Sequence, residues 1–226
     1  MSTGKTSIVI QARMGSKRLP GKSMMKLGDT TVIGYLLRSI VLFGFKKSQV
    51  VVATSNLPEN VVLANYIRSL GFGCFQGSED DVLSRYQMVA REIDSDTIVR
   101  LTGDNPFLDL NIVQCCMNYH FESGSPFTST RVIHPDKSIT RYVPKGSSVD
   151  IFQKELLLGI NADECDDFDR EHVIPQLYRD CKVNIVDKND LISCGIDVAN
   201  VNELSIDTYD EYKEACRIVL TNENTR

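Results

Sequence analysis

The chain has 226 residues, enough to bury a core of its own, and its 42% hydrophobic and 24% charged residues exclude a disordered, collagen-like or fibrous protein. Its 25 basic and 30 acidic residues leave a net charge of −5, which argues against a nucleic-acid binder. We expect no membrane insertion, because no apolar run reaches about 18 residues. The seven cysteines, Cys115 and Cys194 among them, form no Cys-x-x-Cys pair, which predicts reduced thiols in a cytoplasmic protein.

Short apolar runs alternate with segments of helical period along the first half of the chain. The predicted strands cover residues 7–12, 49–54, 74–76 and 97–101, and the predicted helices cover residues 31–43, 59–70, 79–93 and 110–121. The first two strands are apolar on both faces, as in parallel strands that helices cover on both sides. This half therefore predicts a doubly wound, mostly parallel α/β sheet.

The composition changes over residues 123–150, where glycine, serine, proline and threonine gather. Such a composition predicts a small inserted antiparallel β region with loops. Beyond it we predict helices at residues 153–158 and 170–180, strands at 183–186 and 192–196, and a last helix at 201–219. No repeat or linker divides the chain, so residues 1–226 are expected to form a single domain.

The most informative segment, residues 11–22, follows the first predicted strand directly and carries four cations and two glycines. Ligands of open α/β sheets bind at the carboxyl ends of the strands. Glycines let the backbone approach a ligand closely, and arginine and lysine neutralise phosphate oxygens. The segment thus predicts a polyphosphate site, and its alternative is a solvated basic turn.

The end of this segment, Gly21-Lys22-Ser23, imitates a P-loop. That motif needs a glycine five residues before Gly21, where this chain has Ser16, and Pro20 interrupts the loop. The Walker interpretation is therefore excluded.

The same segment resembles the signature Ala-Arg-x-x-Ser-x-Arg-Leu-Pro-x-Lys of the cytidylyltransferases that make CMP-activated sugar acids. The matching residues are Ala12, Arg13, Ser16, Arg18, Leu19, Pro20 and Lys22. The most similar branch is that of spore coat polysaccharide biosynthesis protein F, which is similar to CMP-Kdo synthetase and acylneuraminate cytidylyltransferase. The resemblance spans about residues 7–215, with further matching segments at 53–55, 77–86, 100–106, 170–173 and 195–197.

This resemblance implies the Rossmann-like fold of the nucleotide-diphospho-sugar transferases, CTP and a small sugar acid as substrates, and a homodimer. It also implies a set of nucleotide-binding residues: Gln11, Ala12, Arg13, Gly15, Ser16, Arg18, Lys22, Gly77, Thr102 and Gly103. The expected catalytic residues are Arg18, Lys22 and Asp104, with the two cations stabilising charge that develops during transfer. The Kdo branch usually has glutamine where this chain has Thr102, so the identity of the sugar does not carry over.

Two aspartates are candidate metal ligands. Asp104 follows the predicted strand at 97–101, and a carboxylate among phosphate-binding cations fits Mg²⁺. Asp197 is expected to close the short strand at 192–196 in the same way, and the resemblance implies that aspartates at these two places hold the metal. The alternative for each is a cap on the following helix.

The acceptor side is expected in and after the inserted region, with Arg141, Asp150, Glu171 and His172 as contacts, because a cation suits a sugar carboxylate. His120 and His134 lack partners at zinc spacing and are expected to be structural. The acidic segment 79–81 is expected to open a helix, where negative charge favours the helix dipole.

Together these features predict a Mg²⁺-dependent cytidylyltransferase that transfers CMP from CTP to a nonulosonic or Kdo-like sugar acid for surface glycan biosynthesis and releases pyrophosphate. One alternative is a nucleotidyltransferase that acts on a sugar phosphate or another phosphorylated acceptor. The other is a catalytically silent nucleotide-binding subunit of the same fold.

Overall fold

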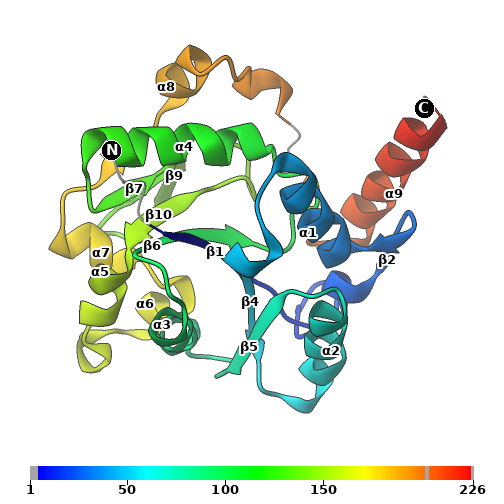
Figure 1. Cartoon of the computed structure of the whole chain (residues 1–226), viewed down its shortest axis with the longest axis horizontal. Helices are drawn as coiled ribbons and strands as arrows, with labels where there is room; N and C mark the ends of the chain where they lie inside the picture. Colours follow the sequence, from blue (N-terminus) through cyan, green and yellow to red (C-terminus); the bar gives the residue numbers. More distant parts are fainter. Residues whose placement is uncertain (1–4, 202–203, 225–226) are drawn as a thin grey trace.

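The structure is a computed structural model that describes residues 5–201 and 204–224. A seven-stranded sheet in the order β11-β7-β10-β6-β1-β4-β5 runs through its centre (Figure 1). Four neighbouring strands are parallel: β6 (Thr97–Thr102), β1 (Thr6–Gln11), β4 (Val50–Ser55) and β5 (Gly73–Gly77). The predicted doubly wound, mostly parallel sheet is confirmed.

Helices cover both faces of this sheet, because β1 carries apolar side chains on both of its faces. Ile8 and Ile10 pack in one buried cluster with residues of α1 (Val32–Phe43), α2 (Val61–Ser69) and α4 (Leu110–Ser123). Val9 packs in a second cluster with residues of α3 (Val82–Glu92), α5 (Lys154–Gly159), α6 (Asp167–His172) and α7 (Pro175–Asp180). Figure 1 shows α4 and α3 on opposite sides of the strands. The carboxyl ends of β1 and β6 are therefore fixed from both sides.

The predicted β region after α4 is present, but only part of it stands apart from the main sheet. β8 (Arg131–Ile133) and β9 (Ile139–Arg141) form a small antiparallel ribbon. β7 (Phe127–Ser129) and β10 (Asp150–Gln153) join the main sheet, with β10 antiparallel to β6 and to β7. β11 (Asn184–Ile185) extends the sheet in parallel beside β7. The register of β10 places Asp150 opposite Arg100.

Two predictions for the last third of the chain are wrong. The expected strand at 192–196 is absent, and α8 (Lys188–Ser193) takes up the first part of that segment. The helix forms because a capping box between Asp187 and Asp190 stabilises its first turn. The expected helix at 170–180 is two helices, α6 and α7, because the chain turns at Val173 with φ 72° and Pro175 opens the second helix.

The last helix, α9 (Tyr209–Asn224), begins later than expected, and residues 202–203 of the predicted span lie outside the described residues. It packs on β2 (Lys26–Leu27) and the start of α1 in a third apolar cluster (Figure 1). The remaining short elements are β3 (Thr30–Thr31) and the 3-10 helices η1 (Lys22–Met24), η2 (Lys47–Gln49), η3 (Pro58–Asn60), η4 (Ala162–Glu164) and η5 (Val198–Asn200). Within the described ranges, we find no helix with both the length and the apolar character to cross a membrane.

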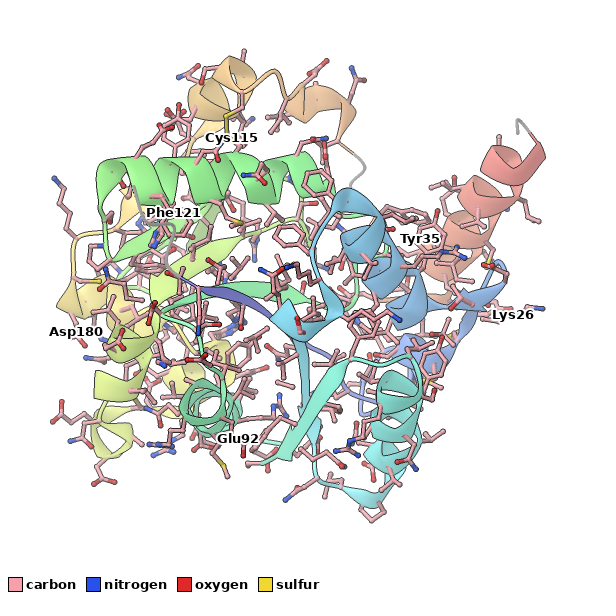
Figure 2. The ribbon with its side chains drawn as sticks, viewed as in Figure 1. Lys26, Tyr35, Glu92, Cys115, Phe121 and Asp180 are labelled. Carbon is pink, nitrogen blue, oxygen red and sulfur yellow. A yellow bond between two sulfur atoms is a disulfide. The ribbon has the colours of Figure 1, made fainter. Side chains whose placement is uncertain are left out.

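A disulfide joins Cys115 on α4 to Cys194, the residue that follows α8 (Figure 2). The expectation that all cysteines are reduced is therefore wrong for this pair. The two residues are 79 positions apart in sequence, and their Cα atoms lie 6.2 Å apart. By contrast Cys116 is a core residue, and burial raises the pKa of its thiol to about 12.

Candidate active site

A cavity of about 480 Å³ opens where β1 and β6 end. It is lined by Gln11, Ala12, Arg13, Ser16, Lys17, Arg18, Lys22, Ser23, Thr102, Gly103, Asp104, Glu171, His172 and Asp207. A second cavity of about 370 Å³ shares Gln11, Arg13, Lys17 and Glu171 with the first and extends it toward residues 79–82. We call the two adjoining cavities the cationic groove. Most of the predicted nucleotide-binding residues lie together on its wall.

The loop after β1 is held in shape by its own hydrogen bonds. Within it, the Gly21 N–H donates to the Met14 carbonyl at 2.8 Å, with Gly21 at φ 74°. From outside, the Met14 N–H donates to the Asn60 side chain at 2.8 Å. Ser23 Oγ donates to the Arg13 carbonyl at 3.2 Å. The loop therefore presents its cations from a fixed backbone.

Gly103 allows β6 to come close to this loop. Its N–H donates to the Gln11 carbonyl at 2.8 Å. A Cβ at this position would lie only 2.9 Å from the Cβ of Ala12 and 3.0 Å from Ile33 Cδ1. Only glycine fits without moving its neighbours, and this contact sets Asp104, the next residue, at the edge of the groove.

Lys22 joins two carboxylates at the centre of the groove. Its Nζ lies 3.4 Å from Asp104 Oδ2 and 2.9 Å from Asp207 Oδ1. The Ile206 N–H donates to the Asp104 carbonyl at 2.8 Å, so the segment before α9 lies along Asp104. Asp104 Oδ1 is buried and has no hydrogen-bond partner among the described residues. Two acidic groups and one ammonium thus meet where the two strands end.

Asp207 is the most strongly ion-paired carboxylate of this centre. Arg18 Nη2 lies 2.7 Å and Lys145 Nζ 2.6 Å from Asp207 Oδ2, in addition to the contact from Lys22. Burial would raise the pKa of Asp207, but the hydrogen bonds from Lys145 and Lys22 lower it to about 2. The carboxylate is therefore ionised at neutral pH and neutralised by the cations around it.

The structure does not bring Asp197, the predicted second metal ligand, to Asp104. Asp197 caps η5, where its side chain accepts from the Ala199 N–H at 3.1 Å. It lines another cavity, of about 470 Å³, beside Arg141 and Lys188. Asp207, and not Asp197, lies with Asp104 on the wall of the cationic groove. The sequence interpretation missed it because residue 207 fell inside a helix predicted to start at 201, although Ser205-Ile206-Asp207 repeats the pattern of an apolar residue followed by an aspartate before a helix.

Glu171 and His172 of the expected acceptor side lie on the wall of the cationic groove. The turn at Val173, a buried β-branched residue with φ 72°, ends α6 immediately after His172 and is a strained conformation. Burial lowers the pKa of His172. The charge of Glu171 opposes this effect, and nearby arginines strengthen it. The imidazole therefore faces the groove in its neutral form at pH 7.

The two other expected acceptor contacts, Asp150 and Arg141, do not line the cationic groove. Asp150 is fully buried and accepts from Arg100 at 3.0 Å and from Arg131 at 2.6 Å, so no acceptor can reach it. Burial would raise the pKa of Asp150, but the two arginines lower it. Arg141 lies with Asp197 on the other cavity. Asp150 is linked to the groove through Arg100, whose Nη2 donates to Oε1 of the groove residue Gln11 at 3.2 Å.

Two predicted nucleotide-binding glycines, Gly15 and Gly77, are not among the residues that line the groove. The Gly77 carbonyl at the end of β5 accepts from the Asn56 N–H at 2.7 Å, and a Cβ on Gly77 would lie 3.0 Å from the Arg85 side chain. A Cβ on Gly15 would lie 2.9 Å from Glu79 Oε1. Glu79 crowds the position of Gly15 and Arg85 that of Gly77, and both residues lie in the segment 79–93 that the sequence predicted as a helix.

A doubly wound sheet with a cationic loop after its first strand defines a nucleotide-binding α/β protein. The chain belongs to the cytidylyltransferase family, whose model matches residues 7–216, and it is accordingly a nucleotidyltransferase. It is 33% identical over 181 residues to the spore coat polysaccharide biosynthesis protein SpsF of Bacillus subtilis strain 168, which covers 76% of this chain and 71% of SpsF.

Two further comparisons agree with the family. A cytidylyltransferase structure from Leptospira borgpetersenii superposes with a TM-score of 0.78 at 26% identity and covers 97% of this chain and 95% of that one. A 3-deoxy-manno-octulosonate cytidylyltransferase from Trichlorobacter lovleyi is 31% identical over 103 residues, which is 45% of this chain and 39% of the relative. The predicted family and its Rossmann-like fold are confirmed.

Proposed function

We propose that the protein is a Mg²⁺-dependent cytidylyltransferase that transfers CMP from CTP to a sugar acid and releases pyrophosphate, in the synthesis of a surface glycan. The observation that carries this proposal is the convergence of Lys22, Asp104 and Asp207 beside the loop cations. The names of SpsF and of the 3-deoxy-manno-octulosonate relative support the class of product.

The chemistry of Asp104 and Asp207 fits Mg²⁺. The buried Oδ1 of Asp104 lacks a partner among the described residues, and Asp207 is ionised. No cluster of three or more histidine, cysteine or acidic residues suited to a metal occurs in the described part of the chain. A pair of carboxylates suits an ion that completes its coordination with substrate phosphates and water. When bound there, Mg²⁺ would neutralise charge on the triphosphate.

The protein contributes positioning and positive charge to the transfer. Arg13, Arg18 and Lys22 would hold the triphosphate on the loop after β1. A hydroxyl of the acceptor attacks the α-phosphorus and loses its proton to solvent water, the new phosphorus–oxygen bond forms, the bond to the β-phosphate oxygen breaks, and pyrophosphate leaves. Lys22 and Arg18 stabilise the charge that develops on the phosphates.

Lys145 adds a cation that the sequence interpretation did not include. It comes from the segment between β9 and β10 and reaches Asp207 at 2.6 Å. Gly146, at φ 83°, packs so closely on Ser205 that its Cβ would lie 2.8 Å from the Ser205 Cβ. The turn is thus fixed, and Lys145 would help to orient Asp207.

The acceptor is proposed to contact Glu171 and His172, because both share a cavity wall with Asp104 and Lys22. A neutral imidazole can donate a hydrogen bond to a sugar hydroxyl or accept one from it, and a carboxylate can accept one. A cytoplasmic location and a homodimer complete the proposal, and the resemblance to sugar-acid cytidylyltransferases supports both.

The test is pyrophosphate release with Mg²⁺ and each of CTP, ATP, GTP and UTP against a panel of sugar acids and sugar phosphates, with Asp104→Asn as the inactive control. CTP-specific release that needs a sugar acid and is lost in the variant is the expected result. Release with a sugar phosphate alone would change the acceptor class. CTP binding without release from any acceptor would favour a silent subunit, and absence of CTP binding would overturn the nucleotide assignment.

A further inference from the structure

Glu79 neutralises Arg13, one of the cations proposed to hold the triphosphate. Arg13 Nη1 lies 2.5 Å from Glu79 Oε1, and both side chains line the second cavity of the cationic groove. The same carboxylate oxygen lies 2.9 Å from the position that a Cβ on Gly15 would take. The negative charge of Glu79 therefore sits directly against the backbone of the loop that would receive phosphates.

Glu79 and the neighbouring Arg85 each have buried polar atoms without a hydrogen-bond partner among the described residues. Glu79 Oε2 is buried and accepts no hydrogen bond from the described residues. Arg85 is fully buried, and only its Nη1 is used, in a hydrogen bond of 2.8 Å to the Ser78 carbonyl. The Nε and Nη2 atoms of Arg85 are buried and have no partner in the described part of the chain. Unpaired charged groups of this kind are costly to bury.

Arg85 is also electrostatically linked to both members of the pair. Burial lowers the pKa of Arg85, the charge of Glu79 opposes this effect, and the charge of Arg13 adds to it. Arg85 lies in the first turn of α3, and Glu79 lies three residues before that helix. The Arg85 guanidinium lies at the Ser78 carbonyl, one peptide bond away from Glu79, so a rotation of the Glu79 side chain would exchange one arginine for the other.

We propose that Glu79 sets the affinity for the nucleotide by exchanging partners: it holds Arg13 when the groove is empty and pairs with Arg85 when a triphosphate takes Arg13. The exchange moves a negative charge away from the phosphates and gives the free Arg85 nitrogens an acceptor. Glu79 is a positioning residue that acts through Arg13. This inference rests on the proposed function only in that the ligand is a triphosphate.

Glu79→Gln tests the exchange, because it removes the charge and keeps the shape. In calorimetric titrations with CTP and Mg²⁺ and no acceptor, the variant should bind CTP roughly tenfold more tightly, which corresponds to about 1.4 kcal/mol. Glu92→Gln is the matched control, since it removes an exposed charge at the far end of α3 and should leave the affinity unchanged (Figure 2). An unchanged or weaker affinity in Glu79→Gln would overturn the proposal.

Arg85→Lys supplies a second arm, because lysine keeps the charge but loses the planar set of donors. It should weaken CTP binding several-fold in the native background and have no effect in the Glu79→Gln background. Equal effects in both backgrounds would contradict the exchange. Thermal unfolding of each variant shows whether it is folded.

A crystal structure of the native protein with CTP decides the question without any variant. The Glu79 carboxylate should contact Arg85 and leave Arg13 to the phosphates, and a retained pair with Arg13 would refute the inference. If the native protein binds no nucleoside triphosphate, the proposed function and this inference fail together. If it binds CTP but Glu79→Gln binds no tighter, only the inference fails.

Discussion

Lys22 Nζ and Asp207 Oδ1 lie 2.9 Å apart although 185 positions separate the two residues in sequence. The contact joins the loop after the first strand to the segment before the last helix, and Lys22 also reaches Asp104 at the end of β6. Three distant parts of the chain thus build one charged centre. A substitution in any one of them should change the charge balance around the other two.

Asp207→Asn should lower kcat by at least about 100-fold, because it removes a carboxylate proposed to hold Mg²⁺ beside the transferring phosphate. The three cations around it would also lose their common negative charge. Pyrophosphate release at saturating CTP measures the effect. Asp197→Asn is the matched control and should retain native kcat, because Asp197 only caps η5. Loss of activity in Asp197→Asn with activity kept in Asp207→Asn would reverse our assignment.

The fold and the cationic loop after β1 could be predicted because their signals are local. The apolar runs of β1, β4 and β6 and the cations of the loop after β1 are visible in short stretches of sequence. Lys145 could not be found in this way, and Asp207 had only the short pattern of an apolar residue followed by an aspartate. Their positions depend on how the segment before α9 and the turn at Gly146 pack against Asp104 and Ser205.

The error at Asp197 has the same origin. An apolar stretch before an aspartate predicts a strand end wherever it occurs, but the capping box at Asp187 turned this stretch into α8. The pairing of Cys115 with Cys194 likewise depends on contacts between α8 and α4 that no local pattern reports.

Gly103→Ala should destabilise the protein by about 1–3 kcal/mol, as expected of a substitution that overpacks a core. The new methyl would press against Ala12 and Ile33 and force apart the ends of β1 and β6. Urea unfolding measures the loss, and calorimetry should show weaker CTP binding.

Gly159→Ala is the comparison for that change. A Cβ at this position in α5 meets no atom within 4 Å in the described structure, so the substitution should be neutral or slightly stabilising. Equal losses of stability in the two variants would show that the close approach at Gly103 is not the cause.

The titration of His120 should lower the free energy of unfolding as the pH falls. Burial lowers its pKa, and its Nδ1 lies 3.0 Å from Thr128 Oγ1 on β7. Below the pKa of the unfolded chain, about 6.5, the unfolded state binds a proton that the folded state does not. The stability should then fall by up to about 1.4 kcal/mol for each pH unit until the folded imidazole is also protonated.

His120→Gln removes this contribution. Its unfolding free energy, measured in urea at pH 7 and pH 5, should fall less over that interval than that of the native protein. Identical pH dependence in the two proteins would exclude His120 as the titrating group.

Substitutions of Asp150 and His172 should have different effects, the first on stability and the second on acceptor binding. Asp150→Asn leaves the buried Arg100 and Arg131 without their carboxylate, and breaking a buried pair of this kind costs about 3–5 kcal/mol. We expect a large loss in urea unfolding and a nearly native KM for the acceptor, because no substrate reaches a fully buried residue.

His172→Gln should show the opposite pattern, since its side chain lines the groove. We expect a KM for the acceptor raised roughly tenfold or more, in line with the loss of one buried hydrogen bond to substrate, and a nearly native KM for CTP. Gln still fills much of the space of the imidazole, so the stability should change little. If Asp150→Asn raised the KM for the acceptor at native stability while His172→Gln did not, the acceptor would contact the side of the sheet that we assign to structure, and the original expectation for Asp150 would be restored.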